Sequence, residues 1–451
     1  MSHHVSDETI AALATPPGKG AIAIVRASGP SVRQLAERIV RTERALEPRM
    51  ATRATILDED GRAIDHGLAL LFAAPASYTG EDLLELHVHG SPVIVREIMR
   101  VLLACGARQA QPGEFTRRAF LNGKMDLHEA EAVAAIVDAE TRTAARAAAA
   151  NLGGGLAAEV RALRAELGVV LEELSAAIDF PDEVPEPDRQ RLAGTIASIA
   201  SILERLRYDG ERGRLVREGL TAAIVGPPNA GKSSLLNALL GEERALVSEI
   251  PGTTRDTIEE TIVIGGVPVR LIDTAGIRAH ADRLENAGIE RSRRAMASAR
   301  LAIVVVDGSQ QLTAEAVALL DATRDRMRVI FCNKADLGTA GARIPERNAI
   351  VGSTRDPESL GALRRAIARV GWGGDVPDLE RPHLAAVREF AAVNEALHAL
   401  AGAQTTLAAA EPSDFIAGDL QRAFSALGKV SEQDAAEELL SGIFSRFCIG
   451  K

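Results

Sequence analysis

Aromatic residues, cysteines and long apolar runs are all scarce in this 451-residue sequence. Aromatic residues make up only 3% of the chain, so the hydrophobic 46% consists mostly of aliphatic residues, and the Ala and Leu among them favour helices. No apolar run reaches the ~18 residues that a membrane-spanning helix needs. The start of the chain, Met1–Val5, has no basic-then-apolar layout of a secretory signal. We therefore expect a helix-rich protein with no membrane segment.

The three cysteines, Cys105, Cys332 and Cys448, are isolated and lack metal-ligand spacing, which is typical of a reducing compartment and predicts a cytoplasmic protein. A basic module is missing as well. The net charge is −10, and the last 76 residues contain 6 basic and 11 acidic residues. No segment is basic enough to bind nucleic acid by charge alone. If RNA is a substrate, we expect a partner to contribute much of the electrostatic attraction.

What the chain does contain is a phosphate-binding loop pattern, G-x4-G-K-S, at Gly226–Ser234. The apolar, β-branched run Leu220–Val225 precedes it and the helix-forming run Leu235–Leu240 follows, which is the strand-to-helix context that the motif requires. Lys232 is expected to reach the β- and γ-phosphates, and the Ser233 hydroxyl to bind Mg²⁺. The predicted nucleotide contacts in this loop are Asn229, Ala230, Gly231, Lys232, Ser233 and Ser234.

Further motifs follow in the order that a guanine-nucleotide switch requires. Gly252–Asp256 supplies threonines for Mg²⁺ and the γ-phosphate. The strand Val269–Asp273 leads into a segment that faces the metal and the γ-phosphate. After the strand Val329–Asn333 comes Asn333–Asp336, in which the carboxylate of Asp336 accepts two N–H groups that guanine offers and adenine does not. The predicted contacts are Asp273, Thr274, Ala275, Gly276, Asn333, Lys334, Asp336 and Ser353.

The catalytic plan departs from the commonest one for GTPases. Many place a glutamine just after the Asp-x-x-Gly motif to orient water, but Ile277 stands there. The amide oxygen of Asn229 offers a substitute, because a monovalent cation bound beside it can neutralise charge on the phosphates. The position of Asn229 alone supports a role as an ordinary turn residue about as well as a role as a cation ligand.

The rest of the chain predicts a multidomain fold that combines α/β and all-α parts. Strands at Gly20–Arg26, His66–Phe72 and Leu83–His89 alternate with helices in residues 1–120, which form a small α+β or α/β domain. Residues 121–216 and 376–451 are mainly helical, and Ser431 is expected to cap a helix over 431–447. They flank residues 217–375, so we expect one discontinuous helical domain into which a Ras-like P-loop domain is inserted.

Besides the nucleotide motifs, the chain contains a set of distinctive stretches: Ala14–Gly18, Thr79–Asp82, Pro112–Phe115, Ala119–Asn122, Asp179–Asp182 and Phe447–Lys451. The closing tetrapeptide, Cys448–Lys451, is the most specific part, because most GTPases have nothing like it. With these stretches and motifs, the chain resembles the MnmE (TrmE) family of tRNA modification GTPases over essentially its full length.

The resemblance implies a function and a set of partners. The family works with a flavoprotein, MnmG, to add a carboxymethylaminomethyl-type group to C5 of the wobble uridine of certain tRNAs. The one-carbon unit comes from 5-formyltetrahydrofolate or a related tetrahydrofolate. The N-terminal domain is then expected to bind the folate and to form a homodimer, and the two proteins to form a heterotetramer.

The resemblance also assigns residues to metals and to catalysis. Mg²⁺ would be bound by Ser233 and Thr254. The catalytic acidic residue falls on Glu285, with Arg278 as a further candidate. A potassium ion would be bound by Asn229, Ser248, Ile250 and Thr253, within a nucleotide-contacting loop that comprises Ser248, Glu249, Ile250, Pro251, Gly252, Thr253 and Thr254. Pro251 stands where the family often has a small residue.

The folate contacts implied by the resemblance are Arg26, Glu85, Lys124 and Lys451. Their charges suit the ligand, because cations meet its glutamyl carboxylate and a carboxylate accepts the pterin N–H pair. Cys448 is either a reactive group in the modification or a structural thiol.

Two alternatives remain open. The nucleotide motifs also occur in ribosome-assembly and RNA-binding switch GTPases without modification activity, but such proteins carry a basic RNA-binding module that is missing from the acidic C-terminal residues. The N-terminal domain can also be a dimerisation scaffold without a ligand.

Overall fold

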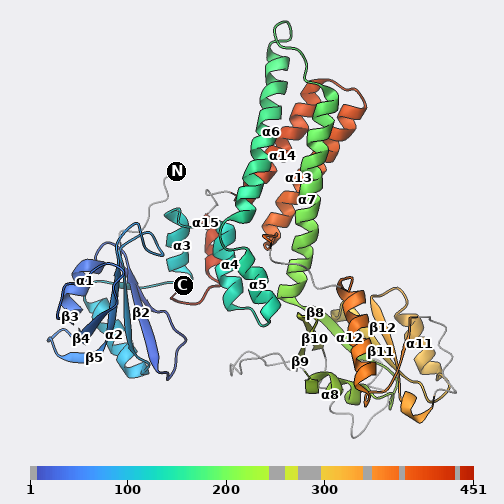
Figure 1. Ribbon diagram of the computed structural model, residues 1–451, viewed down its shortest axis with the longest axis horizontal. Helices are drawn as coiled ribbons and strands as arrows, with labels where there is room; N and C mark the ends of the chain where they lie inside the picture. The colour runs from blue at the N-terminus through green and yellow to red at the C-terminus, as the bar shows by residue number, and fades with distance from the viewer. Residues whose placement is uncertain are drawn as a thin grey trace. The chain divides into compact units, whose positions relative to one another are not determined.

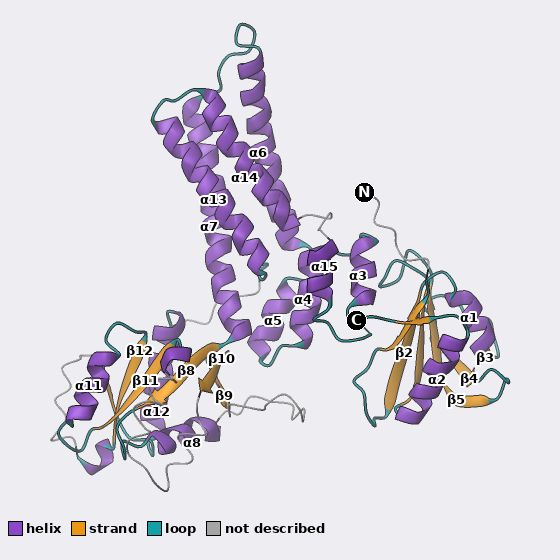
Figure 2. Ribbon diagram, turned by 180° about the vertical axis from the view of Figure 1, so that it is seen from behind, coloured by secondary structure: helices purple, strands orange, loops and turns teal. Residues whose placement is uncertain are grey.

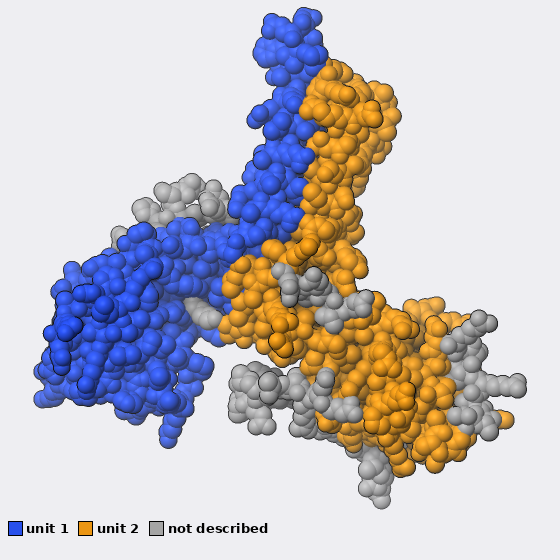
Figure 3. Space-filling model, in the orientation of Figure 1, with its two compact units in different colours: residues 1–134, 153–185, 417–451 blue, residues 135–152, 186–416 orange. Residues whose placement is uncertain are grey.

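The computed structural model describes residues 8–242, 260–272, 296–338, 348–374, 381–431 and 437–450. The chain divides into two compact units, which Figure 3 shows in different colours. Unit 1 comprises residues 1–134, 153–185 and 417–451, and unit 2 comprises residues 135–152 and 186–416. Each unit contains one β-sheet and several helices (Figures 1 and 2). The predicted combination of α/β and helical parts is confirmed.

The sheet of unit 1 is almost wholly antiparallel. Its order is β3-β4-β5-β6-β2-β1-β7, and only the β1–β7 pair is parallel. Helices α1 (Val32–Ile39) and α2 (Pro92–Ala104) pack into the core on one face of it. The strands are β1 (Ile10–Leu13), β2 (Ile22–Ser28), β3 (Val40–Thr42), β4 (Thr52–Leu57), β5 (Ala63–Phe72), β6 (Leu83–His89) and β7 (Arg108–Gln109).

The alternation of side chains along β2 decides what each face of this sheet carries. Ala23, Val25 and Ala27 enter the core beneath α1 and α2. Arg26 therefore projects from the opposite face, because neighbouring residues of a strand point to opposite sides. A smaller apolar cluster that contains Phe115, from α3 (Glu114–Leu121), covers part of that second face.

The end of the chain packs against the helices that follow this sheet. Phe444 of α15 (Glu437–Phe444) and Phe447 share a core with Phe120 of α3. The ring centroids of Phe444 and Phe447 lie 5.4 Å apart. Gly113 permits this approach, because a Cβ there would lie 2.5 Å from the Phe444 carbonyl oxygen. The other helices of unit 1 include α4 (Leu127–Val137), which straddles the boundary at residue 134, α6 (Gly155–Asp179) and α14 (Ser413–Ser431), most of which belongs to this unit.

One helix boundary differs from the sequence prediction. Ser431 was expected to cap a helix over 431–447, but it is the last residue of α14. Gly428 does not end the helix, which continues through Lys429 and Val430 to Ser431, so this serine lies at the end of one helix and not before the start of the next.

The sheet of unit 2 has the order β13-β12-β11-β8-β10-β9, and only the β9–β10 pair is antiparallel. Apolar residues on both sides of β8 and β11 enter two separate cores, as expected for a sheet covered on both faces. The strands are β8 (Leu220–Val225), β9 (Glu260–Ile264), β10 (Val267–Ile272), β11 (Leu301–Asp307), β12 (Arg328–Asn333) and β13 (Ile350–Val351).

The helices of unit 2 pack on this sheet and on one another. The helices α8 (Lys232–Glu242) and α12 (Pro357–Trp372) contribute to one core, and α11 (Ala314–Ala322) to the other. The first core also includes Ala144 of α5 (Arg142–Ala150) and Val216 of α7 (Arg189–Glu218). Helix α13 (Val387–Ala408) packs against α7. The boundaries at residues 120, 216 and 375 stay a prediction.

In the part of the chain that the structure describes, no helix combines the length and the apolar character needed to span a membrane.

Candidate nucleotide site and N-terminal binding site

The phosphate-binding loop begins where β8 ends, in the middle of the parallel part of the sheet. The carboxyl ends of such strands are the usual place for a bound nucleotide. Gly226 allows the loop to leave close to β11, because a Cβ there would lie 2.2 Å from the Val305 carbonyl oxygen. Asn229 and Gly231 both have positive φ angles, of 61° and 99°, which bend the backbone into a compact loop.

Lys232 closes this loop. Its Nζ donates hydrogen bonds to the carbonyl oxygens of Gly226 and Pro227, both at 2.8 Å. Burial lowers the pKa of Lys232 from its ordinary value, because the ammonium is partly removed from water. A phosphate in the loop would supply the negative charge that this half-buried cation lacks, so the geometry suits an anionic ligand.

Asn333 joins the phosphate loop to the segments that carry the predicted base contacts Asp336 and Ser353. Its side chain is 2% exposed. The Nδ2 atom donates to the Ala230 carbonyl oxygen at 3.0 Å, and Oδ1 accepts from the Thr354 N–H at 3.1 Å. The Asn333 side chain therefore bonds directly to the phosphate loop at Ala230 and to the loop after β13 at Thr354. Gly231 also lies beside its amide.

Asp336 lies in the short 3-10 turn η2 (Ala335–Leu337), and its side chain is 37% exposed. Nη1 of Arg355 lies 3.7 Å from Oδ2 of Asp336. The Asp336 carboxylate is thus open to a base. Lys334 has a φ of 68°, and its Nζ pairs with Asp307 at 2.7 Å, which positions the start of η2. Ser353 is buried, and its Oγ accepts from the Arg355 N–H at 3.2 Å.

Many of the predicted nucleotide contacts fall outside the described residues. The structure therefore says nothing about the predicted catalytic residues Arg278 and Glu285, about Ile277, or about Lys451 at the chain end. The other predicted contacts that lie outside the described residues are Ser248, Glu249, Ile250, Pro251, Gly252, Thr253, Thr254, Asp273, Thr274, Ala275 and Gly276.

The described loop residues have donor atoms that suit the expected metals. Ser233 is exposed at the start of α8 and offers a hydroxyl oxygen, a ligand type that Mg²⁺ accepts alongside phosphate oxygens. Asn229 is exposed in the loop and offers a neutral amide oxygen, which suits a monovalent cation. Ser234 is exposed one residue further along α8.

The N-terminal candidates Arg26 and Glu85 are direct cross-strand neighbours on β2 and β6. The guanidinium of Arg26 donates from Nε and Nη2 to Oε1 of Glu85, at 2.9 and 2.7 Å. Oε2 of Glu85 lies 3.4 Å from Nε2 of His87. Both members of the pair are only partly exposed, so each charge depends on the other for compensation.

Two aromatic rings and the C-terminal tail complete what we call the Arg26 cluster: Arg26, Glu85, Tyr78, Phe115 and Gly450. The guanidinium carbon lies 5.7 Å from the centroid of each ring, within range of a cation–π contact. Nη1 donates to the Gly450 carbonyl oxygen at 3.4 Å. The sequence analysis missed the two aromatic residues and Gly450. The rarity of tyrosine, of which the chain has only 2, was the one available signal.

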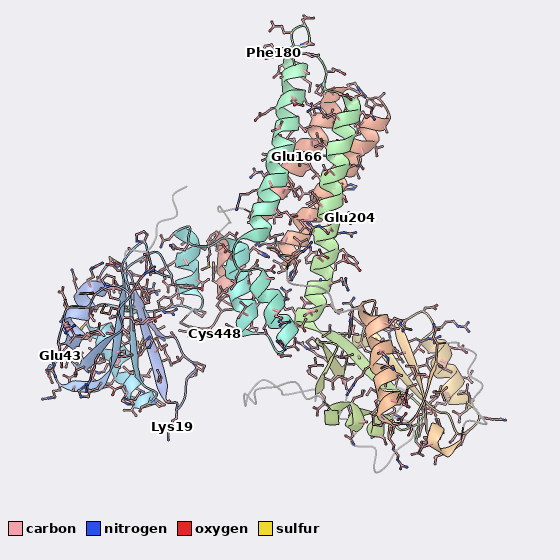
Figure 4. All side chains as sticks on the ribbon, in the orientation of Figure 1. Lys19, Glu43, Glu166, Phe180, Glu204 and Cys448 are labelled. Atoms are coloured by element: carbon pink, nitrogen blue, oxygen red, sulfur yellow. The ribbon has the colours of Figure 1, made fainter. Side chains whose placement is uncertain are left out.

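The tail enters this cluster through close backbone contacts. The Gly113 N–H donates to the Cys448 carbonyl oxygen at 3.4 Å, and a Cβ on Gly450 would lie 2.2 Å from the Leu13 carbonyl oxygen. Figure 4 marks Cys448 on the segment after α15. Its thiol is exposed, whereas Cys332 is buried and burial raises the pKa of its thiol to about 11. Only the former is accessible to a substrate.

A network of buried ion pairs lies next to the Arg26 cluster and includes Glu114, the neighbour of Phe115 in the chain. Arg118 is 3% exposed and pairs with Glu81 at 3.1 Å and with Glu114 at 3.1 Å. Glu114 also pairs with Arg108 at 2.6 Å. Burial by itself would raise the pKa of Glu114, but hydrogen bonds from Arg108, from a backbone N–H and from Arg118 bring it below the ordinary value.

The last folate candidate that lies among the described residues is Lys124. It is exposed, and its side chain lies beside Gly80, where a Cβ would be 3.3 Å from the Lys124 Cγ. It therefore lies at the loop that carries Tyr78 and Glu81, and in the described part of the chain no hydrogen bond or ion pair joins it to Arg26 or Glu85. A ligand that used Arg26 and Lys124 together would have to reach from one to the other.

Comparison with known proteins covers the whole chain. The family described as "GTP-binding protein TrmE N-terminus" matches residues 9–124, and the "MnmE helical domain" family matches residues 127–448. A tRNA modification GTPase MnmE from Chloroflexus aurantiacus is 45% identical over 99% of this chain and 100% of its own length. The chain belongs to the MnmE family. The resemblance inferred from the sequence is thereby confirmed.

Two other MnmE proteins are similar over comparable lengths. The protein from Azoarcus sp. is 43% identical and that from Listeria innocua 40%, each over 98% of this chain. Membership of the MnmE family makes the chain a GTP hydrolase, in agreement with the phosphate loop described above. The match to the helical-domain family runs from residue 127 to residue 448 and includes the residues of the nucleotide sheet.

Proposed function

We propose that this chain is a potassium-stimulated GTPase that acts in tRNA wobble-uridine modification as a homodimer, together with a flavoprotein of the MnmG type, in the cytoplasm. The observation that supports the nucleotide part best is the Asn333 side chain, which joins the phosphate loop to the base-recognition turn. The phosphates and the base of one nucleotide are thus recognised by segments that are held together.

Mg²⁺ would be bound by Ser233 and Thr254 beside the phosphates. K⁺ would be bound by Asn229, Ser248, Ile250 and Thr253. When bound, these cations would compensate the charge that develops between the β- and γ-phosphates. Glu285 would orient the attacking water, with Arg278 as a further candidate. Lys232 contributes its half-buried ammonium to the phosphates.

The N-terminal site would hold a tetrahydrofolate such as 5-formyltetrahydrofolate. Glu85 suits the pterin N–H pair, Arg26 would lie at the same end of the ligand because it is paired with Glu85, and Lys124 and Lys451 suit the glutamyl carboxylates. The support from the geometry is that Arg26 and Glu85 lie on one face beside Tyr78 and Phe115, whose rings offer surfaces for a planar ligand. Cys448, exposed on the neighbouring tail, would be accessible to a one-carbon group.

The decisive measurement is the profile of wobble nucleosides in the tRNA of cells that lack this protein. We expect the C5-modified uridines to be lost, restored by the wild-type protein and not by Asp336→Asn. An unchanged nucleoside profile in the deletion strain would contradict the modification role while leaving the GTPase activity in place.

Purified protein tests the cation separately. We expect faster GTP hydrolysis in potassium chloride than in sodium chloride at equal ionic strength. Equal rates would contradict the potassium site without touching the tRNA proposal.

A further inference from the structure

The hairpin β9–β10 lies in the chain between two of the predicted nucleotide-contacting segments. β9 begins at Glu260, shortly after Thr254, and β10 ends at Ile272, directly before Asp273. Among the described strands, β9 is the edge strand of its sheet, and its partner is β10. A hairpin at a sheet edge is held by fewer backbone bonds than a central strand. Its position therefore depends on contacts outside the sheet.

Such a contact exists at the turn of the hairpin. The Thr141 hydroxyl donates a hydrogen bond to the Gly266 carbonyl oxygen at 3.2 Å. The same hydroxyl accepts from the Ala144 N–H at 3.0 Å and thereby caps α5. One buried oxygen thus fixes both the start of α5 and the turn.

The fit between the turn and α5 is tight. Gly266 has a φ of +81°, and a Cβ there would lie only 2.2 Å from Oγ1 of Thr143. Ala144, one residue further along α5, is buried in the same core as Ile264 and Val267 at the two ends of the turn. Near the start of β10, close to the turn, a Cβ on Gly219 would lie 2.8 Å from the Pro268 carbonyl oxygen.

From this geometry we propose that Thr141 is a positioning residue for GTP hydrolysis and that it acts through the turn of the β9–β10 hairpin. The hydroxyl holds the turn against α5, and the hairpin carries that constraint to its two ends, which lead to Thr254 and Asp273. A small displacement of catalytic groups is enough to slow a reaction severely. The proposal rests on the GTPase activity alone and is independent of the folate, potassium and tRNA assignments.

The first test replaces the hydroxyl and keeps the shape. In the full-length protein, we expect Thr141→Val to lower kcat for GTP hydrolysis by roughly 5- to 10-fold, with KM and GDP affinity changed by less than about 2-fold. Thr141→Ser keeps the hydroxyl, so it should stay near the wild-type rate.

Thr313 supplies a matched control. It caps α11 through a hydrogen bond from Ala316 N–H at 3.1 Å, in the same unit, and no bond from its hydroxyl to the hairpin is found among the described residues. Thr313→Val therefore loses the same kind of cap, and we expect its kcat to stay within about 2-fold of wild type. Equal effects of the two valine variants on kcat would overturn the proposal.

A second pair of variants tests the contact from the other side and does not alter the cap. Gly266→Ala should lower kcat, because the new methyl group collides with Thr143, and Thr143→Ala added to it should restore much of the loss. Gly373→Ala is the control for backbone strain, since Gly373 has a φ of +86° and nothing lies within 4 Å of a Cβ there. A kcat for Gly266→Ala equal to that of Gly373→Ala, or no recovery in the double variant, would also count against the proposal.

The wild-type protein separates this inference from the function itself. If wild type hydrolyses no GTP, the GTPase assignment fails. If wild type is active and Thr141→Val matches it in kcat, only the positioning role fails. Thermal unfolding of each variant shows whether it is folded. If Thr141→Val is unfolded, the comparison of Gly266→Ala with the Gly266→Ala/Thr143→Ala double variant decides whether the contact positions the hairpin.

Discussion

The two candidate sites of this protein are built in opposite ways. The phosphate loop is a run of consecutive residues whose backbone geometry does most of the work, with Asn229 and Gly231 at positive φ. The Arg26 cluster gathers side chains from distant parts of the chain, and Arg26 and Gly450 are 424 residues apart in sequence. The first type of site is recognisable from a short motif, and the second depends on the fold.

The two sites also differ in how their charges are compensated. Among the described residues, the hydrogen bonds of Lys232 go to neutral carbonyl oxygens of its own loop, whereas Arg26 already has a carboxylate partner in Glu85. An anion that enters the phosphate loop thus meets a cation that is bonded to no carboxylate in the described part of the chain. A ligand of the Arg26 cluster has to join or replace an existing ion pair. We therefore expect tight anion binding at the first site and more selective, weaker binding at the second.

The largest effect is expected from Asp336→Asn at the base-recognition turn. Loss of the carboxylate should weaken GTP binding by roughly 10³-fold or more, because two guanine N–H groups lose their acceptor. Xanthosine triphosphate has a carbonyl in place of the amine, so the variant should bind it better than GTP. Fluorescence titration with both nucleotides measures this, and equal loss of both would indicate a collapsed pocket.

At the N-terminal site, Arg26→Ala should weaken binding of 5-formyltetrahydrofolate by roughly 10- to 100-fold, because it removes a cation and leaves Glu85 uncompensated. GTP hydrolysis should not change. Isothermal titration of the full-length protein checks the affinity. Arg33→Ala is the control, since that arginine forms an exposed pair with Asp82 in the same domain. No saturable binding even by wild type would favour a scaffold role for the domain.

The potassium assignment predicts an intermediate effect. Asn229→Gly keeps a residue that tolerates the positive φ and removes the amide oxygen, so the loop shape is retained. We expect the ratio of GTP hydrolysis rates in potassium and sodium to fall by about 10-fold, toward unity. GDP affinity serves as the check on the loop. A variant that keeps the full potassium effect would show that Asn229 is a turn residue only.

The smallest effect concerns the ion network behind the Arg26 cluster. The pKa of Glu114 is below its ordinary value of 4.5, so its stabilising contribution is present above that pH and is lost as the pH falls through the lowered pKa. Glu114→Gln should lower the unfolding free energy by about 1–2 kcal/mol at pH 7 and by less in acid.

Denaturant unfolding at pH 7 and pH 3 measures this difference. Glu97→Gln removes an exposed pair with Arg100 and should have no measurable effect. A loss from Glu114→Gln that is the same at both pH values would show that the charge of Glu114 contributes nothing.

Sequence patterns predicted most of the longer strands, because apolar runs such as Leu301–Asp307 and Leu83–His89 are local signals. They missed short or weakly patterned elements, including β1, β3, β7 and β9. Ser431 was misplaced for a related reason, since a capping residue is also tolerated inside a helix.

What the sequence by itself determined is the chemistry that consecutive residues carry. Gly226–Ser234 predicts a phosphate loop and Asn333–Asp336 a guanine-selective turn, because backbone geometry and hydrogen-bonding groups follow directly from adjacent residue types. Only the tertiary structure decided that Arg26 pairs with Glu85 beside two aromatic rings, or that Thr141 bonds to the turn at Gly266. These contacts join residues 59 and 125 positions apart, and strand pairing and core packing bring such residues together without any local pattern.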